Sequence, residues 1–391
     1  MSKTISTKIF SNKSSYLLPA FLSGIIMIAA YPPLEQGYLA WIALLPLLGT
    51  CLKVSPPRAF WAGFIFGLPI NLYLNPYLAN VLFPYLPTPL NLTALVCLVA
   101  FISLFYGLFS LSANLACRLG KAWFTALAVP SLWLLMEYSR SFGFMAYNVG
   151  YLGYSQWGYP ALLNIAAVFG YWGLPFLIIF FQTILLLLYR KDLTGFKLYT
   201  VSALFFFLLG TGLILPAFQK PDNDNRQLLV TLIQGNSNSA EMVEKSKTEI
   251  MQHYLALTRQ ALEAAPATAL VVWPETVVDL DFRTTQNHIP AMVQAAEDHG
   301  VDLLYGARVR DRGHLFNSIA LITKEQERIP LYHKQRLVPF VEYFPMEELL
   351  NRLLKLELLL GSYTAGDETT VFKIDDIPLA GVICFESYFG D

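Results

Sequence analysis

Three separate runs in the second half of the chain carry a carboxylate, an ammonium and a thiol. Glu275 lies in VVWPET at 271–276, Lys334 in LYHKQRLVPFVEYFP at 331–345, and Cys384 in GVICFES at 381–387. A thiol attacks a carbonyl only as a thiolate, so it needs a base or a cation nearby. Glu275 could take the proton, and Lys334 could stabilise both the thiolate and an oxyanion. These groups suffice for covalent acyl transfer through a thioester.

Each of these residues also has a purely structural interpretation. Cys384 ends the apolar, strand-like run PLAGVIC, where a buried structural thiol is common, while Glu275 could cap a helix and Lys334 could be a solvated surface residue. His333 could assist proton transfer, although a packed or surface histidine is the simpler interpretation. The remaining cysteines lie in apolar stretches where a small thiol is unremarkable: Cys51, Cys97 and Cys117. We find no metal-spaced Cys/His cluster and no glycine-rich phosphate loop, and expect no metal, no cofactor and no nucleic-acid partner.

The elements that must position these residues fall into two halves of different composition. Of the 391 residues, 55% are hydrophobic and 14% charged, which is unusual for a soluble protein. Residues 1–219 contain eleven Lys or Arg and three acidic residues, whereas residues 220–391 contain sixteen basic and twenty-five acidic ones. The polar run PDNDN at 221–225 lies at the boundary. We therefore expect a transmembrane domain at 1–219 and a globular domain at 220–391.

The first half contains apolar stretches of about membrane length. We predict seven helical spans, at 16–31, 38–52, 59–81, 92–117, 122–137, 161–189 and 198–218. Lys and Arg residues precede the first span and fall in every other loop, with Arg140 as the exception. Because cations favour the cytoplasmic side, the amino terminus is predicted to be cytoplasmic and residues 220–391 to lie outside. A cleaved signal peptide is the alternative for the first span.

The second half alternates strand-like and helix-like runs, which favours a layered α/β sandwich. Strands are predicted at 228–233, 268–273, 301–306, 315–322, 370–374 and 378–384, and helices at 240–264 and 289–299. Cys384 then ends a strand, and Glu275 lies just beyond the end of another. The leucine-rich run 349–360 is either a core helix or an arm lying on the bilayer that admits acyl chains.

The order of these motifs resembles the nitrilase, or carbon-nitrogen hydrolase, superfamily: WPET, then YHK with VPF and EYFP, then GVICFES. VTLIQGNSN, GARVRDRGHLFNSIALI and the preceding spans resemble, more narrowly, the bacterial apolipoprotein N-acyltransferases. SLWLLMEYSRSFGF and NVGYLGYSQW also resemble that family, although its usual Phe-Pro-Trp is replaced here by Phe144, Met145 and Ala146.

The resemblance implies a nitrilase-like αββα catalytic domain behind a multi-span helical domain, in the bacterial inner membrane with the catalytic domain periplasmic. It implies that Cys384 takes an acyl chain from a phospholipid and passes it to the amino group of a diacylglyceryl-cysteine apolipoprotein. In this resemblance Glu275 is the general base, Lys334 stabilises the tetrahedral intermediate, and Glu342 and Glu386 are supporting carboxylates. The family's usual glycine before Glu342 is Val341 here, and its tyrosine after the nucleophile is Phe385.

The resemblance also predicts further strands and a last span beyond Asp391, because members of the family continue past the cysteine motif. We therefore expect the sandwich to be incomplete in these 391 residues. Two other functions remain open at this point. One is a membrane-tethered amidase or nitrile hydrolase that uses the same three residues, for which seven spans have no obvious purpose. The other is an inactive, truncated relative.

Overall fold

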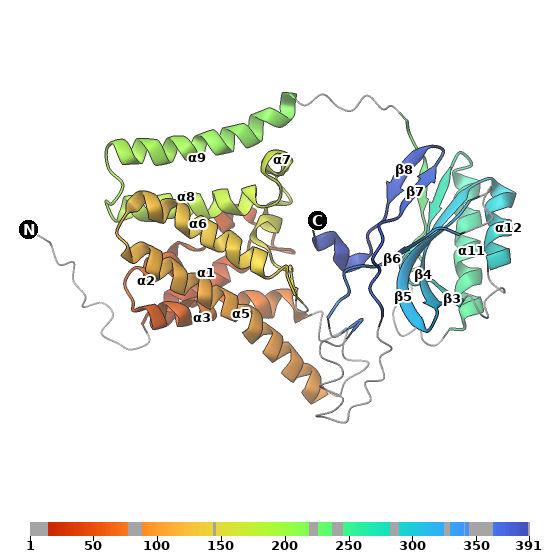
Figure 1. Cartoon of the computed structure of the whole chain (residues 1–391), viewed down its shortest axis with the longest axis horizontal. Coiled ribbons are helices and arrows are strands. Elements are labelled where there is room, and N and C mark those ends of the chain that lie inside the picture. The colour runs from red at the N-terminus through yellow and green to blue at the C-terminus, as the bar shows by residue number, and fades with distance from the viewer. Residues whose placement is uncertain are drawn as a thin grey trace, which may run out of the picture. The chain divides into compact units, whose positions relative to one another are not determined.

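The computed structural model describes residues 15–76, 88–143, 146–218, 226–236, 245–281, 289–323, 329–339, 341–343 and 363–389. The chain forms two compact units, Met1–Pro221 and Asp222–Asp391. The first is helical and the second combines helices with β-sheet (Figure 1).

The helical unit is built mainly from apolar helices. Its α-helices are α1 (Leu17–Ile28), α2 (Leu45–Cys51), α3 (Pro56–Leu74), α5 (Thr88–Arg118), α6 (Ala122–Ser139), α7 (Pro160–Phe169), α8 (Gly173–Tyr189) and α9 (Phe196–Ile214). Short 3₁₀ helices occur at Gly37–Trp41, Leu152–Gln156 and Leu215–Phe218. Prolines at the first turns of α2, α3 and α7 suit helix starts, where the missing N–H is not needed.

Two described helices are long and apolar enough to cross a membrane, Asn91–Arg118 within α5 and Phe196–Ile214. The predicted span 161–189 is divided, because α7 and α8 meet at an angle of 109° around Gly170, whose φ is +64°. If this bent pair forms one broken span, the described residues provide three candidate spans. The chain is thus a membrane protein by these helices, and the full count of seven spans stays a prediction.

Arg140, the exception in the predicted charge pattern, is not a loop cation. It follows α6 and is 3% exposed. Its Nη2 donates to the Val149 carbonyl at 2.8 Å, and its guanidinium lies 5.2 Å from the centre of the Tyr151 ring. The nearby Glu137 carboxylate accepts from the Leu152 amide at 2.7 Å. Arg140 and Glu137 therefore anchor the segment that follows α6. Because Arg140 is buried, it does not count as one of the loop cations that indicate orientation.

In the described residues, the second unit contains one mixed sheet and one hairpin. The sheet runs in the order β1 (Val230–Leu232), β2 (Leu270–Val272), β4 (Asp302–Asp311), β5 (His314–Ile322) and β6 (Leu331–His333), and β3 (Val278–Asp281) also pairs with β4. The first crossover is α11 (Lys247–Ala264), and α12 (Ile289–His299) precedes β4. β1, β2, β3 and β4 are parallel, whereas β5 and β6 continue antiparallel.

Both faces of this sheet are covered within the second unit (Figure 1). α11 and α12 pack on one face through a core that includes Met251, Trp273 and Met292. The hairpin of β7 (Val371–Ile374) and β8 (Ile377–Ala380) covers the other through Phe372 and Ile374. Helix, sheet and hairpin confirm an α/β fold, and the second helical layer of the predicted αββα sandwich has no counterpart among the described residues.

β2 and β3 together form one interrupted strand beside β4. β2 pairs with Asp302–Leu304 and β3 with Ala307–Arg310, so the residues between them leave the sheet opposite Gly306. A side chain at Gly306 would place its Cβ 2.5 Å from the Cα of Glu275 and 2.5 Å from the Pro274 carbonyl oxygen. Glycine therefore allows the WPET segment to rest directly on β4.

Three features of the predicted strands need correction. β8 ends at Ala380, so Cys384 does not end a strand; it begins a 3₁₀ helix, Cys384–Tyr388. The pairing stops at Ala380 because this residue lies opposite Val371, the first residue of β7. Further along, the Ile383 amide donates to the Glu386 carboxylate at 2.7 Å. The prediction also missed β3 and β6, and it ended β4 five residues too early. The leucine-rich run 349–360, Phe144 and Met145 lie outside the described residues.

Candidate active site

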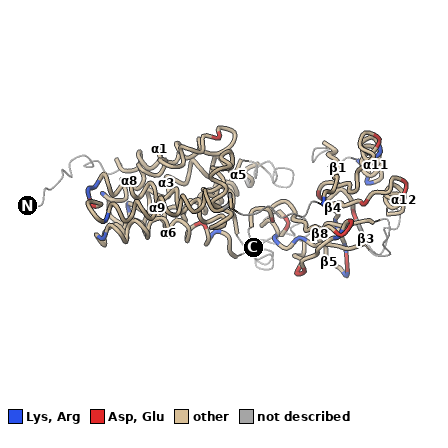
Figure 2. Tube along the Cα trace, turned by 90° about the horizontal axis from the view of Figure 1, so that it is seen from above, with Lys and Arg blue, Asp and Glu red and all other residues tan. Residues whose placement is uncertain are grey.

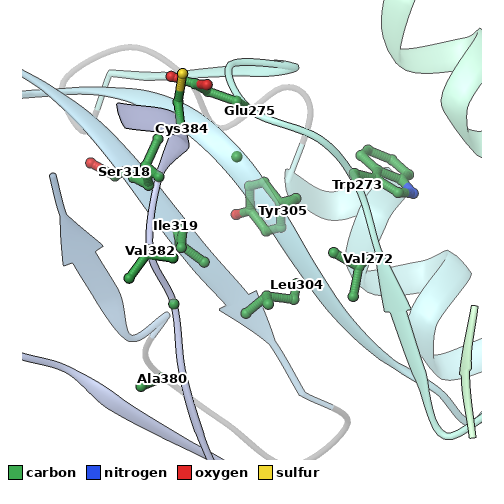
Figure 3. Close-up of a pocket in the computed structure, with 13 residues that line it drawn as sticks. Val272, Trp273, Glu275, Leu304, Tyr305, Ser318, Ile319, Ala380, Val382 and Cys384 are labelled. Carbon is green, nitrogen blue, oxygen red and sulfur yellow. The ribbon is translucent and has the colours of Figure 1, made fainter. Parts of the chain in front are cut away.

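Cys384 and Glu275 line one pocket of about 410 Å³ on the face of the sheet away from α11 and α12. Cys384 has a φ of +49°, a left-handed conformation that is uncommon for a residue with a side chain. Figure 3 shows its thiol directed at the Glu275 carboxylate, with Val272, Leu304 and Val382 among the apolar walls. The structure therefore brings the predicted nucleophile and the predicted base together.

Glu275 enters the pocket from the interruption between β2 and β3. The Val277 amide donates to the Gly306 carbonyl at 3.1 Å, and the Gly306 amide donates to the Pro274 carbonyl at 3.2 Å. These two bonds hold the segment against β4 on both sides of Glu275. The carboxylate is 36% exposed, so it can exchange protons with a bound substrate while its backbone is fixed.

Lys334 follows β6 and is 1% exposed. Its Nζ lies 2.9 Å from Glu342 Oε1 and 3.9 Å from Glu275 Oε1. A buried ammonium is stable only when it is paired and hydrogen bonded, and these two carboxylates meet that need. The solvated-surface interpretation of Lys334 is thus excluded. Lys334, Glu275 and Glu342 form one charged cluster.

Glu342 is buried and has its own backbone partners. Its Oε2 accepts from the Val338 amide at 2.8 Å, and its own amide donates to the Val338 carbonyl at 2.9 Å. Together these contacts close a short loop after Lys334. Glu342 is thus held in place beside the Lys334 ammonium, and its supporting role in catalysis stays a prediction.

Glu386 connects the cysteine segment to the lysine segment. Its Oε1 accepts from the Tyr332 hydroxyl at 2.8 Å, the Gln335 amide at 2.7 Å and the Arg336 amide at 3.2 Å. Its Oε2 accepts from the Ile383 amide at 2.7 Å. A single buried carboxylate thus satisfies four donors and fixes the distance between the two segments that carry Cys384 and Lys334.

The electrostatics of Cys384 show how its reactivity is controlled. Partial burial raises the pKa of the thiol, the Glu275 carboxylate raises it further, and Lys334 opposes them by lowering it. The thiol is therefore predominantly protonated at neutral pH. Attack requires a base that takes the proton during the reaction, and Glu275 is the described carboxylate placed at the thiol.

His333, which precedes Lys334, makes its contacts with β5. Its Nδ1 shares a hydrogen bond of 2.7 Å with the Ser318 hydroxyl, and its ring stacks on Phe316 with centroids 4.3 Å apart. Burial lowers the pKa of this histidine. These contacts favour the packed histidine over a proton-transfer role. Among the described residues no group of His, Cys, Asp and Glu has the arrangement of a metal site.

Sequence reasoning did not select Asn317, which lies within this cluster. Its Nδ2 donates to Glu275 Oε1 at 2.6 Å and to Glu342 Oε1 at 3.0 Å. The available signal was a polar Asn-Ser pair in the otherwise apolar strand LFNSIALI, at 315–322.

Comparison with known proteins covers both units. A family model described as the apolipoprotein N-acyltransferase N-terminal domain matches residues 23–184, and the carbon-nitrogen hydrolase model matches residues 229–391. The apolipoprotein N-acyltransferase of Methylococcus capsulatus is 28% identical over 391 aligned positions, which cover 96% of this chain and 74% of that protein. The enzyme of the same name from Geobacter metallireducens gives the same figures. That of Coxiella burnetii is 27% identical, covering 94% of this chain and 76% of its own length.

Proposed function

Because this chain belongs to the apolipoprotein N-acyltransferase family, we propose that Cys384 carries an acyl group between two lipid substrates. The donor is a phospholipid, and the acceptor is the amino group of a diacylglyceryl-cysteine at the start of an apolipoprotein. The observation that supports this most directly is the meeting of the Cys384 thiol and the Glu275 carboxylate beside buried Lys334. These are the three groups that acyl transfer through a thioester requires.

In the first half-reaction Glu275 takes the thiol proton while the sulfur of Cys384 attacks the ester carbonyl of the phospholipid. The new C–S bond moves the carbonyl electron pair onto oxygen, and the Lys334 ammonium stabilises that oxyanion. When the intermediate collapses, the C–O bond breaks and the leaving alkoxide takes the proton from Glu275. A lysophospholipid leaves, and the acyl group remains on Cys384.

In the second half-reaction the free amine of the lipoprotein attacks the thioester. Glu275 takes a proton from the attacking nitrogen and returns it to the departing sulfur, so Cys384 is restored as a thiol. Glu342 keeps Lys334 next to the oxyanion in both halves. Glu386 keeps the two segments in register, since its carboxylate contacts both.

The charge pattern supports a location for this reaction. Figure 2 shows the described Lys and Arg residues of the helical unit gathered mainly at one end of its helices. We place this end in the cytoplasm, following the preference of basic loops for that side. The amino terminus is then cytoplasmic, the hydrolase-like unit is periplasmic, and the protein resides in the bacterial inner membrane.

The direct test is transfer of labelled acyl chain to the protein. Membranes that contain the chain are incubated with phospholipid labelled in its acyl groups, and the protein is then separated under denaturing conditions. We expect a label that neutral hydroxylamine removes, as it does from thioesters. Cys384→Ala should carry no label, and the Cys51→Ala control should label like the unaltered chain.

A membrane-tethered amidase or nitrile hydrolase would give a different pattern. Rapid turnover of short amides or nitriles, with no label from phospholipid, would contradict the acyltransferase. So would a phospholipid label that persists in Cys384→Ala, since the acyl group would then reside elsewhere.

A further inference from the structure

Asn317 lies in the middle of β5, opposite Arg308 of β4, and is 2% exposed. Its backbone carbonyl accepts from the Lys334 amide at 2.8 Å. A rigid strand therefore fixes this side chain, while the residues it contacts come from loops. Asn317 is therefore positioned to hold the side chains around it in place.

The amide nitrogen of Asn317 has two hydrogens, and both are used. One is donated to Glu275 Oε1 at 2.6 Å and the other to Glu342 Oε1 at 3.0 Å. The opposite orientation of the amide would set its oxygen against two carboxylates, so these contacts determine which atom is nitrogen. Its Oδ1 is buried without a partner among the described residues, a cost that the two charged acceptors offset.

The lysine does not hold both carboxylates equally. Its Nζ is 2.9 Å from Glu342 but 3.9 Å from Glu275, which is beyond hydrogen-bond length. The short contact of Glu275 is thus the one from Asn317. Arg308, the charged residue opposite Asn317, is engaged by Asp279 through two bonds of 2.6 Å and 3.0 Å. Arg308 therefore does not hold Glu275 in place of Asn317.

We propose that Asn317 is the positioning residue of the general base. Its amide holds the Glu275 carboxylate beside the Cys384 thiol and leaves the Lys334 ammonium to the oxyanion. This inference rests on the proposed function for its catalytic consequence. The positional part of it depends only on Glu275 and Cys384, which allows the two to be tested separately.

The positional part is tested with iodoacetamide, which reacts with the Cys384 thiolate without any acyl transfer. Besides burial, the charged groups that shift the pKa of this thiol are Glu275, Lys334 and Glu342. In the full chain Asn317→Ala releases Glu275 from the thiol, so alkylation should reach its half-maximal rate at a lower pH than in the unaltered chain. Asn317→Asp adds a negative charge and should move that pH upward. Identical profiles for all three proteins would overturn the proposal.

The catalytic part is tested by the rate of acyl labelling from phospholipid. Displacement of a reacting group by about 1 Å costs about 100-fold in rate, and we expect a loss of that order in Asn317→Ala. The apparent KM for phospholipid should stay within a few-fold. A loss that appears only as a raised KM would assign Asn317 to substrate binding instead and contradict its positioning role.

Thr268→Val is the matched control. Thr268 precedes β2, is 5% exposed and shares a 2.7 Å hydrogen bond with Thr231 of β1, a strand that β2 and β4 separate from β5. Thr268→Val removes this buried hydrogen bond without touching the carboxylates, so its alkylation profile and its labelling rate should match those of the unaltered chain. An unaltered chain that alkylates but takes no acyl label would count against the proposed function, while the alkylation profiles would still decide the role of Asn317.

Discussion

At the scale of single residues, the site couples a thiol that resists ionisation to a carboxylate that can take its proton. Burial and Glu275 raise the pKa of Cys384, and Lys334 only partly offsets them. A resting thiolate would be open to oxidation and alkylation. In the mechanism proposed above, the thiol stays protonated until Glu275 takes its proton at a bound ester. Under that proposal the same carboxylate both lowers the background reactivity of the thiol and enables acyl transfer.

This coupling predicts opposite effects of one substitution on two reactions of Cys384. Glu275→Gln removes a negative charge beside the thiol, which lowers the pKa of Cys384 and should speed its alkylation by iodoacetamide at pH 8 to 9. The same change removes the base and should slow acyl labelling by about 100- to 10,000-fold. Lys334→Met should slow both reactions, because it removes the positive charge that stabilises the thiolate and the oxyanion. Parallel loss of both reactions in Glu275→Gln would contradict the coupling.

Glu386 carries a second prediction, which concerns stability. All four partners of the Glu386 carboxylate are donors, and Glu386→Gln replaces one of its two acceptor oxygens with an NH₂ group. This NH₂ group must then face at least one other donor. One or more of its four donors then loses its partner, at about 1–3 kcal/mol if that donor is buried. We expect a lower thermal midpoint for the second unit and reduced acyl labelling. Glu368→Gln, at an exposed position, is the control and should alter neither.

The five acidic, basic and thiol residues of the site could be selected from the sequence because each stands in a short, distinctive motif. Asn317 could not, because its importance depends on two carboxylates that are 42 and 25 positions away in the chain. Nothing in LFNSIALI indicates which partners a buried amide will find. Long-range polar contacts of this kind become visible only when the strands are assembled.

At the scale of elements, the site depends on interruptions of regular structure. Glu275 leaves the sheet between β2 and β3, and Cys384 begins a 3₁₀ helix after β8 has ended. Apolar periodicity predicted the cores of most strands but not these interruptions. The run PLAGVIC is apolar throughout, yet its strand stops at Ala380, opposite the first residue of β7, and the Ile383 amide donates to Glu386 instead. β3 was missed because Asp279 and Asp281 interrupt its apolar pattern, and Arg308 and Lys247 pair with Asp279.

The interrupted strand predicts that Gly306 is needed for activity more than for folding. In Gly306→Ala the new methyl group would lie 2.5 Å from the Cα of Glu275, so the WPET segment must move away from β4. Displacement of the base should lower acyl labelling by at least 10-fold. Gly158→Ala is the control, because no heavy atom lies within 4 Å of the added methyl group. Unchanged labelling in Gly306→Ala would show that Glu275 does not depend on this close approach.

At the scale of the whole molecule, two units of different composition place an aqueous chemical site on a membrane protein. Many described apolar side chains of the helical unit are exposed, among them Phe196, Phe206 and Phe207 on α9. Lipid is the natural environment for such side chains. The function proposed above gives the membrane unit a purpose, because both of the proposed substrates are lipids.

The orientation of the chain is the prediction that belongs to this scale. If the basic loops are cytoplasmic, Cys384 faces the periplasm and Lys121, an exposed residue before α6, faces the cytoplasm. In a chain whose other cysteines are replaced by alanine, a membrane-impermeant maleimide should label Cys384 in intact spheroplasts. A cysteine introduced by Lys121→Cys in a Cys384→Ala chain should be labelled only after permeabilisation. The reverse pattern would place the catalytic unit in the cytoplasm, where the acceptor amine of an exported lipoprotein could not reach it.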